Sequence, residues 1–291
     1  MRSDPRAPAR PVRGDLVSGL HVQPVTATIG ANVDGVDLRE PISEVDRKAI
    51  LEALFEHHVL FFRNQDITPE QQVAFAKQFG PISFPPFAPK YGDNPEYIVL
   101  DQTNPRGEGA DQWHSDNTFM AEPPMGSILH AVKIPEVGGD TCFASAVAAY
   151  EALSPPIRRL VDGLTAIHDI TKPLLKGIEA GHADVDLAEI QAQWPPVEHP
   201  VVRTHPVTGK KALFVNRNST TRLVGLSESE NDALLPMLMD HIRSPEFQCR
   251  FTWDTHSVAF WDNRTTQHFA VPDYRTRRIM NRVTIAGEKV I

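Results

Sequence analysis

The C-terminal part of the chain constrains the fold most, because it contains four short apolar runs in close succession. These are FQCRFTW (247–253), SVAFWD (257–262), QHFAV (267–271) and IMNRVTIA (279–286). Each run has the length and the β-branched or aromatic content of a strand, and turn-forming or polar residues separate it from its neighbours. Short strands at this spacing are typical of a β-sandwich or a β-barrel.

Earlier segments predict further strands, with helices between them. Strand-like runs lie at 21–30, 59–62, 97–100, 127–134, 201–205 and 211–216. Apolar periodicity and capping residues predict helices at 43–57, 69–79, 145–153, 155–165 and 227–242. A long insertion at 171–198 contains at most one short helix, near 185–193. We therefore expect a mainly β fold with helices on its outside.

Composition and charge narrow the classes of function. The formal net charge of −8 argues against nucleic acid or an acidic membrane as a partner, because both require a basic surface. No apolar run approaches the roughly 20 residues of a membrane span. Residues 1–20 are rich in Pro, Arg and small residues and lack an apolar core, which predicts a disordered tail and not a secretory signal. The two cysteines, Cys142 and Cys249, form no disulfide framework and fit a reducing cytoplasm.

Two segments far apart in the chain contain residue types that bind metals. In QWHSDNTF (112–119), His114 and Asp116 are two positions apart, so on an extended segment both side chains would point to the same face. His268 follows much later, and only the fold can bring it to the other two. Two imidazoles and one carboxylate are the ligand set that binds non-haem Fe(II) and leaves three coordination positions open.

The spacing of His114 and Asp116 is weak evidence by itself. A chain with 12 His and 37 Asp and Glu residues contains a His-x-Asp or His-x-Glu triplet about once or twice by chance. A second triplet, His182 to Asp184, does occur, in a polar stretch without a strand pattern. A solvated loop histidine beside an unrelated aspartate therefore remains the alternative to a metal site.

Two arginines near the C-terminus are candidates for binding anions. Strand alternation puts Arg278, Met280 and Arg282 on one face. If that face lies inside the protein, both guanidinium groups need anionic partners, which they can hold by paired hydrogen bonds. The alternative is a solvated surface, because Arg278 ends the charged run RTRR (275–278).

Several of these segments together resemble the taurine dioxygenase/TfdA family of Fe(II)- and 2-oxoglutarate-dependent oxygenases. In family order they are WHSDNTF (113–119), GGDT (138–141), HPVVRTHPVTGKKALFVN (199–216), WDNRTTQH (261–268) and RRIMNRVTIAG (277–287). The resemblance extends over about residues 21–289. It implies a double-stranded β-helix, or jelly roll, as a single domain at 21–291, with the site at its open end and covering segments near 64–126 and 166–198.

The resemblance also implies roles for individual residues. His114, Asp116 and His268 correspond to the iron ligands, with 2-oxoglutarate and O2 as cosubstrates. Arg278 corresponds to the arginine that pairs with the distal carboxylate of 2-oxoglutarate, and Thr141 to a hydroxyl that binds the same carboxylate.

On the side of the primary substrate, Arg282 corresponds to the arginine that binds its acidic head. Phe119 corresponds to an aromatic wall of the pocket. Asp262 is excluded as a fourth ligand because the family triad is already complete. Trp261 and Asn263 are expected to shape the strand near His268 and not to touch the substrate.

The chain departs from the taurine enzymes at four positions of the substrate pocket. A histidine that helps to bind the sulfonate corresponds to Pro85, a tyrosine to Ala88, an asparagine that contacts the amine to Ala110, and a phenylalanine to Ser219. These changes remove polar contacts and bulk together, and an amine without its partner is costly to bind. We therefore expect an acid larger or more apolar than taurine: another alkylsulfonate, a sulfate ester or an aryloxyalkanoate.

The function that the resemblance implies is a dioxygenase of sulfur metabolism. It would hydroxylate a small anionic substrate next to a sulfonate, sulfate or ether group and release succinate and CO2. One alternative is a biosynthetic hydroxylase of the same family that cleaves no bond. Another is a non-catalytic jelly-roll protein that binds anions, against which the complete triad argues. Besides the substrate, the expected partners are further copies of the chain in a homo-oligomer, without nucleic acid or membrane.

Overall fold

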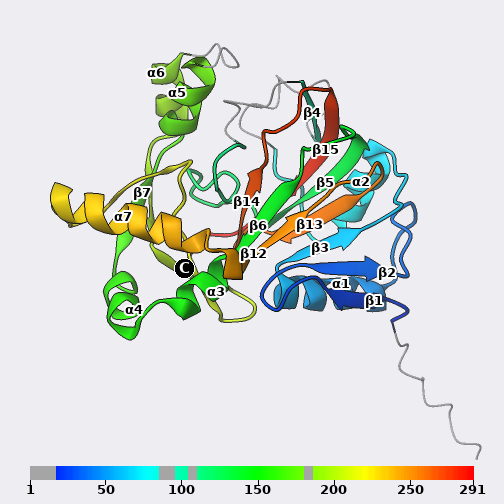
Figure 1. Ribbon diagram of the computed structural model, residues 1–291, viewed down its shortest axis with the longest axis horizontal. Coiled ribbons are helices and arrows are strands. Elements are labelled where there is room, and N and C mark those ends of the chain that lie inside the picture. The colour runs from blue at the N-terminus through cyan, green and yellow to red at the C-terminus, as the bar shows by residue number, and fades with distance from the viewer. Residues whose placement is uncertain (1–17, 85–95, 104–109, 180–185) are drawn as a thin grey trace, which may run out of the picture.

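The structure is a computed structural model that describes residues 18–84, 96–103, 110–179 and 186–291. Its core consists of two β-sheets (Figure 1). The larger sheet contains, in hydrogen-bonded order, β1 (His21–Pro24), β2 (Ala31–Asp34), β3 (Val59–Phe62), β13 (Val258–Asp262), β5 (Gly126–Lys133), β15 (Arg278–Ile285) and β4 (Ile98–Gln102). The smaller sheet contains β12 (Gln248–Phe251), β6 (Thr141–Ser145) and β14 (Thr266–Ala270).

The two sheets share one apolar layer. Leu129, Trp261 and Met280 of the larger sheet pack in the same buried cluster as Phe143 and Phe251 of the smaller sheet. Full burial of such a side chain contributes about 1.5–3 kcal/mol. The facing sheets, with mostly antiparallel strands, form the predicted mainly β jelly-roll core.

Two helices cover the outer face of the larger sheet. They are α1 (Glu44–His57) and α2 (Pro69–Lys77). Both begin where the sequence predicts, because the Ser43 side chain caps α1 and Thr68 forms a capping box with Gln71 at α2. Their apolar faces pack against Ile128, Val283 and Ile285, so alternate residues of β5 and β15 face the helices and the inner layer.

The remaining elements pack beside the two sheets. Their strands are β7 (Thr165–His168), β8 (Val197–Pro200), β9 (Val202–Thr204), β10 (Lys211–Leu213) and β11 (Thr220–Leu223). Their helices are α3 (Ala146–Ala152), α4 (Pro155–Val161), α7 (Glu228–Ile242) and the 3-10 helix η2 (Pro245–Phe247). Residues from most of these elements share a second apolar cluster.

The insertion at 171–198 differs from the prediction. Two helices lie in it, α5 (Thr171–Glu179) and α6 (Leu187–Gln193), and they project from the body of the protein in Figure 1. Pro173 lies in the first turn of α5, where its missing N–H has no helical partner to lose.

Several short strands were not predicted, namely β2, β6, β7, β8 and β11. Segment 155–165 was expected to be one helix, but α4 ends at Val161 and β7 begins at Thr165. Each of these strands has only four or five residues, too few to show a period, and pairing with other strands defines them.

The predicted disordered tail, 1–20, lies outside the described residues except for 18–20, where the Ser18 hydroxyl donates to Asp46 over 2.8 Å. Among the described helices, none combines the length and the apolar character that crossing a membrane requires.

Candidate metal centre and active site

His114 and His268 are held opposite each other by their own backbones. The N–H of His114 donates to the carbonyl of His268 over 3.1 Å, and the N–H of His268 donates back over 2.8 Å. Residues paired in this way project side chains to the same side of a sheet, and the two ring centroids lie 4.1 Å apart. This bridge lies outside any regular strand at His114, and Asp116 begins a turn. The expectation that His114 and Asp116 share a strand face is therefore wrong.

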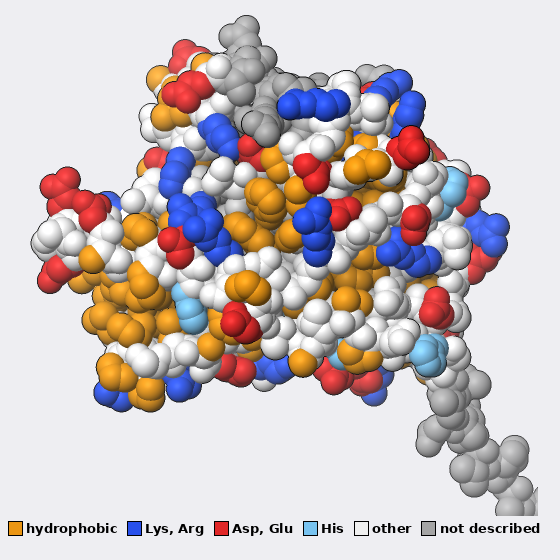
Figure 2. Space-filling view, viewed as in Figure 1, with side chains coloured by type: hydrophobic (Ala, Val, Ile, Leu, Met, Phe, Trp, Pro, Cys, Tyr) orange, Lys and Arg blue, Asp and Glu red, His pale blue; other side chains and the backbone are white. Residues whose placement is uncertain are grey.

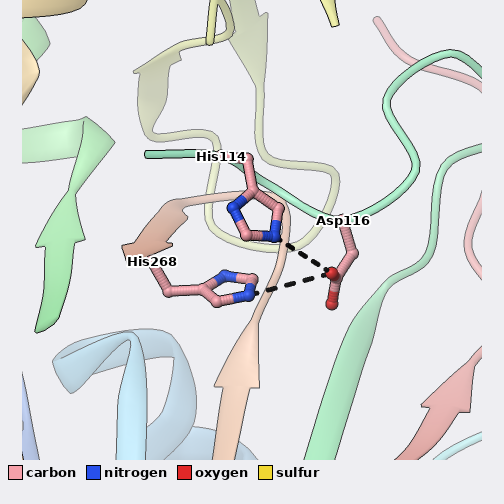
Figure 3. Close-up of side chains that lie close together, drawn as sticks. All are labelled: His114, Asp116 and His268. Atoms are coloured by element: carbon pink, nitrogen blue, oxygen red, sulfur yellow. Dashed lines mark ion pairs between the residues drawn. The ribbon is translucent and has the colours of Figure 1, made fainter. Parts of the chain in front are cut away.

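The turn nevertheless brings Asp116 to the two histidines (Figure 3). Asp116 Oδ1 lies 3.7 Å from His114 Nε2 and 3.8 Å from His268 Nε2. One ligand atom from each residue lies within 4.8 Å of the others, and all three residues are buried. Within the described part of the chain, no other group of three His, Cys, Asp or Glu residues meets this geometry.

The protonation states of the three groups suit a metal. Burial lowers the pKa of His268 to about 3 and also lowers the pKa of His114, so both rings are neutral near pH 7. Burial raises the pKa of Asp116, but Arg282 and the two histidines outweigh it and bring the value to about 2. Two neutral imidazoles and one ionised carboxylate are donors that fit Fe(II).

Asp116 is held by two residues besides its charged neighbours. The Asn263 side chain accepts from the N–H of Asp116 over 2.7 Å and donates to its carbonyl over 3.0 Å. The Ser127 hydroxyl donates to Asp116 Oδ2 over 2.8 Å. Ser127 was not predicted as a site residue, although alternation along 127–134 places this polar side chain on the same face as Leu129.

Asp262 is unavailable to a metal. Arg264 donates to both of its carboxylate oxygens over 2.8 Å, and His205 Nε2 lies 3.0 Å from Oδ2. The pKa of Asp262 is lowered because these partners outweigh the effect of burial. Its exclusion as a fourth ligand agrees with these contacts.

Arg278 is a buried cation with free hydrogen-bond donors. It lies on the inner face of β15 with 3% of its surface exposed. Its Nε and Nη2 atoms have no hydrogen-bond partner among the described residues. Its guanidinium carbon lies 5.9 Å from the ring centroids of both Trp253 and Tyr274. Because a buried charge without an anion is strongly unfavourable, this site suits a carboxylate.

Thr141 lies next to Trp253, one of the two aromatic residues near Arg278. Its hydroxyl oxygen accepts from Trp253 Nε1 over 3.0 Å, so the hydroxyl proton remains free to donate. Gly139 lies beside the same guanidinium, since a Cβ there would be in van der Waals contact with Arg278 Cδ and Nε, at 3.4 Å. The sequence interpretation did not include Trp253, although it ends the predicted strand 247–253.

Arg282 contacts one of the three residues of the candidate metal site. Its Nη1 donates to Asp116 Oδ1 over 3.2 Å, while its Nε has no partner in the described part of the chain. Its side chain is 21% exposed. The guanidinium can therefore meet an anion that reaches the metal site from solvent.

Of the other residues predicted to contact the substrate, the structure describes Phe119, Ser219 and Ala110. Phe119 is buried and contacts Trp194 edge to face, with ring centroids 5.9 Å apart. Ser219 is buried and donates its N–H to Asn216, and the carbonyl of Ala110 accepts from Ala270, two residues after His268. Pro85 and Ala88 lie outside the described residues.

A cavity of about 360 Å³ lies beside Phe119 and Trp194. Its lining includes Met120, the residue after Phe119, and Trp194, which Phe119 contacts. The complete lining is Ser83, Met120, Ala121, Glu122, Trp194, Ala286 and Gly287. Trp194, which follows α6, was not among the predicted pocket residues.

Comparison with known proteins gives consistent matches over most of the chain. The model of the family described as "Taurine catabolism dioxygenase TauD, TfdA family" matches residues 21–284. An alpha-ketoglutarate-dependent sulfate ester dioxygenase of Pseudomonas putida is 38% identical over 280 residues, covering 92% of this chain and 90% of that protein. An alkylsulfatase of Acinetobacter baylyi is 35% identical over 276 residues, covering 92% and 86%. A crystal structure of a taurine dioxygenase from Burkholderia xenovorans has 37% identity and a TM-score of 0.81, covering 94% and 91%.

Proposed function

Because this chain belongs to the taurine catabolism dioxygenase TauD, TfdA family, we propose that His114, Asp116 and His268 bind its catalytic iron. The chain is a 2-oxoglutarate-dependent non-haem iron dioxygenase, with Fe(II) as cofactor and 2-oxoglutarate and O2 as cosubstrates. The observation that carries the assignment is the convergence of these three buried side chains from distant segments. We assign the distal carboxylate of 2-oxoglutarate to Arg278 and Thr141, and the anionic head of the substrate to Arg282.

When bound, the iron with its cosubstrates supplies the oxidation that converts 2-oxoglutarate to succinate and CO2 and hydroxylates a substrate C–H bond. The side chains of this protein hold 2-oxoglutarate and the substrate in the required positions. Arg278 and Thr141 orient the carboxylate end of 2-oxoglutarate by charge-assisted and hydroxyl hydrogen bonds. Arg282 draws the anionic head of the substrate to the edge of the site, so that a neighbouring carbon meets the reactive centre.

We propose a sulfate ester or a long alkylsulfonate as the substrate. The two relatives named for sulfate ester chemistry support this class. Hydroxylation at the carbon that bears the sulfate oxygen gives a product that collapses to an aldehyde and releases the acid. The open hollow near Phe119 offers Met120 and Trp194 to an apolar tail, with Glu122 and Ser83 also in its lining.

The substrate preference can be measured directly. We expect kcat/KM for an alkyl sulfate or a longer alkylsulfonate to exceed that for taurine by at least about tenfold, because each buried methylene adds affinity while an unpaired ammonium loses it. Succinate release, coupled to aldehyde formation, is the readout across sulfate esters, sulfonates and aryloxyalkanoates. Succinate release without any oxidised product would instead favour an unidentified biosynthetic substrate.

Arg282→Ala should remove the preference for anionic substrates, whereas Arg282→Lys should retain part of it. Because Arg282 also touches Asp116, the affinity for Fe(II) should be measured for both variants. Efficient and fully coupled turnover of taurine by the wild type would contradict the proposed substrate class.

We further propose that 64–126 and 166–198 cover the site within a single domain, residues 21–291. Phe119 and Trp194, one from each segment, are in contact. Lys176 of α5 forms an ion pair with Asp111, three residues before His114. These contacts join the insertion to the segment that carries two of the proposed ligands.

We propose a cytoplasmic homo-oligomer. Cys142 and Cys249 are both free thiols, which fits a reducing compartment. Apolar side chains gather on the surface between α4 and α7 in Figure 2. Leu160 of α4 and Met237 of α7 are exposed apolar residues, at 46% and 38%. Such a patch suits contact with another copy. Light scattering over a range of concentrations tests this, and a monomer at every concentration would contradict it.

A further inference from the structure

The two oxygens of the Asp116 carboxylate have different surroundings. Oδ1 is the oxygen near both histidines, 3.7 Å from His114 Nε2 and 3.8 Å from His268 Nε2. Oδ2 accepts a hydrogen bond from the Ser127 hydroxyl over 2.8 Å. Ser127 is fully buried and Asp116 is 4% exposed, so no bulk water competes for this bond.

Ser127 is held rigidly. It lies in β5, in the middle of the larger sheet, opposite Trp261 of β13 on one side and Thr284 of β15 on the other. The backbone of Asp116 is fixed as well, because Asn263 bonds both its N–H and its carbonyl. With both backbones fixed, the bond between Ser127 and Asp116 determines how the carboxylate is rotated.

Resting on the metal site proposed above, we propose that Ser127 is a positioning residue that keeps Asp116 a monodentate ligand. A carboxylate can bind a cation through one oxygen or through both. The ligand set of two histidines and one carboxylate leaves three positions open only if Asp116 uses one oxygen. Ser127 engages Oδ2, so Oδ1, which accepts one hydrogen bond from Arg282 and keeps a second lone pair, is the oxygen that faces the metal site. Arg282 cannot replace it, because Arg282 contacts Oδ1.

The direct test is Ser127→Ala, with Ser127→Cys as a second variant of nearly the same size but with a much weaker donor. Without the hydroxyl, Oδ2 is free to turn to the metal and occupy a position that 2-oxoglutarate needs. We expect the Kd of the Fe(II)-loaded protein for 2-oxoglutarate to rise by about tenfold or more. The Kd for Fe(II) alone should change much less, because Asp116 still binds the metal through one or both oxygens. Both are measured by anaerobic titration.

The binding mode of the Asp116 carboxylate distinguishes a positioning role of Ser127 from a role in packing alone. X-ray absorption of the Co(II)-loaded variants should show a bidentate carboxylate, and the wild type a monodentate one. Ser127→Thr, which keeps the hydroxyl, should restore 2-oxoglutarate affinity. As a matched control, Ser257→Ala removes an equally buried hydroxyl that bonds Arg63 and the backbone of Asp254, and it should leave both affinities unchanged.

Two results would overturn the inference. One is unchanged 2-oxoglutarate affinity in both Ser127→Ala and Ser127→Cys. The other is an equal loss of Fe(II) and 2-oxoglutarate binding with the carboxylate still monodentate, which would make Ser127 a general support of the site. If the wild type itself bound neither Fe(II) nor 2-oxoglutarate, the proposed metal site would fail before the role of Ser127 was tested.

Discussion

Replacing His268 with alanine is expected to abolish 2-oxoglutarate turnover. The variant removes one of three metal donors, and the two that remain, His114 and Asp116, are too few to hold Fe(II) in the buried site. The weak visible charge-transfer band of the complex between Fe(II) and 2-oxoglutarate should disappear as well. Succinate release and anaerobic absorption spectra measure the two effects independently.

The control for His268→Ala is His182→Ala. His182 belongs to the other His-x-Asp triplet of the chain, so by spacing alone it is an equal candidate for a metal ligand. The assignment expects normal turnover and a normal absorption band from that variant. Full turnover by His268→Ala, or loss of the band in His182→Ala, would show that the iron is bound elsewhere.

Arg278→Ala is expected to weaken 2-oxoglutarate binding by about ten- to a hundredfold, because a charge-assisted hydrogen-bonded pair contributes about 1.5–3 kcal/mol. The Nε and Nη2 atoms of the buried guanidinium have no hydrogen-bond partner among the described residues, so their removal breaks no hydrogen bond there. The measurement is the apparent Kd for 2-oxoglutarate of the Fe(II)-loaded protein.

The adjacent arginine provides a matched control. Arg277 is exposed and pairs with Asp101 on the outside of the sheet. Arg277→Ala should therefore leave the affinity for 2-oxoglutarate unchanged, while Thr141→Val should lower it by less than Arg278→Ala does. An unchanged affinity in Arg278→Ala would show that another cation binds the cosubstrate.

Alternation put Arg278, Met280 and Arg282 on one face of β15 but left open whether that face is buried, and the structure decides this. Arg278 and Met280 are both buried there, and Met280 belongs to the layer between the sheets. A strand has a period of two whatever its partners, so the face that contains an arginine, a methionine and a second arginine can be recognised locally. The first residues of α1 and α2 could also be predicted from the local sequence, because Ser43 and Thr68 cap the backbone a few residues ahead of them.

Local pattern failed where an element depends on distant pairing or on a polar contact across the core. The sequence indicated that His114 and Asp116 share a strand, yet the structure joins them through a bridge to His268 and a turn. The helix α5 was not predicted, although Pro173 is compatible with a helix there because it lies in the first turn.

By itself, then, the sequence determined the class of the fold, the family, and the residue types that the iron chemistry needs, because strand periods, caps and motif order are properties of neighbouring residues. Only the tertiary structure decided which atoms meet. Ser127 reaches Asp116 Oδ2, and Trp253 reaches the Thr141 hydroxyl from 112 positions away. Such contacts depend on how two sheets pack, and no local spacing in the chain encodes the side-chain atom that fills a given place in a shared core.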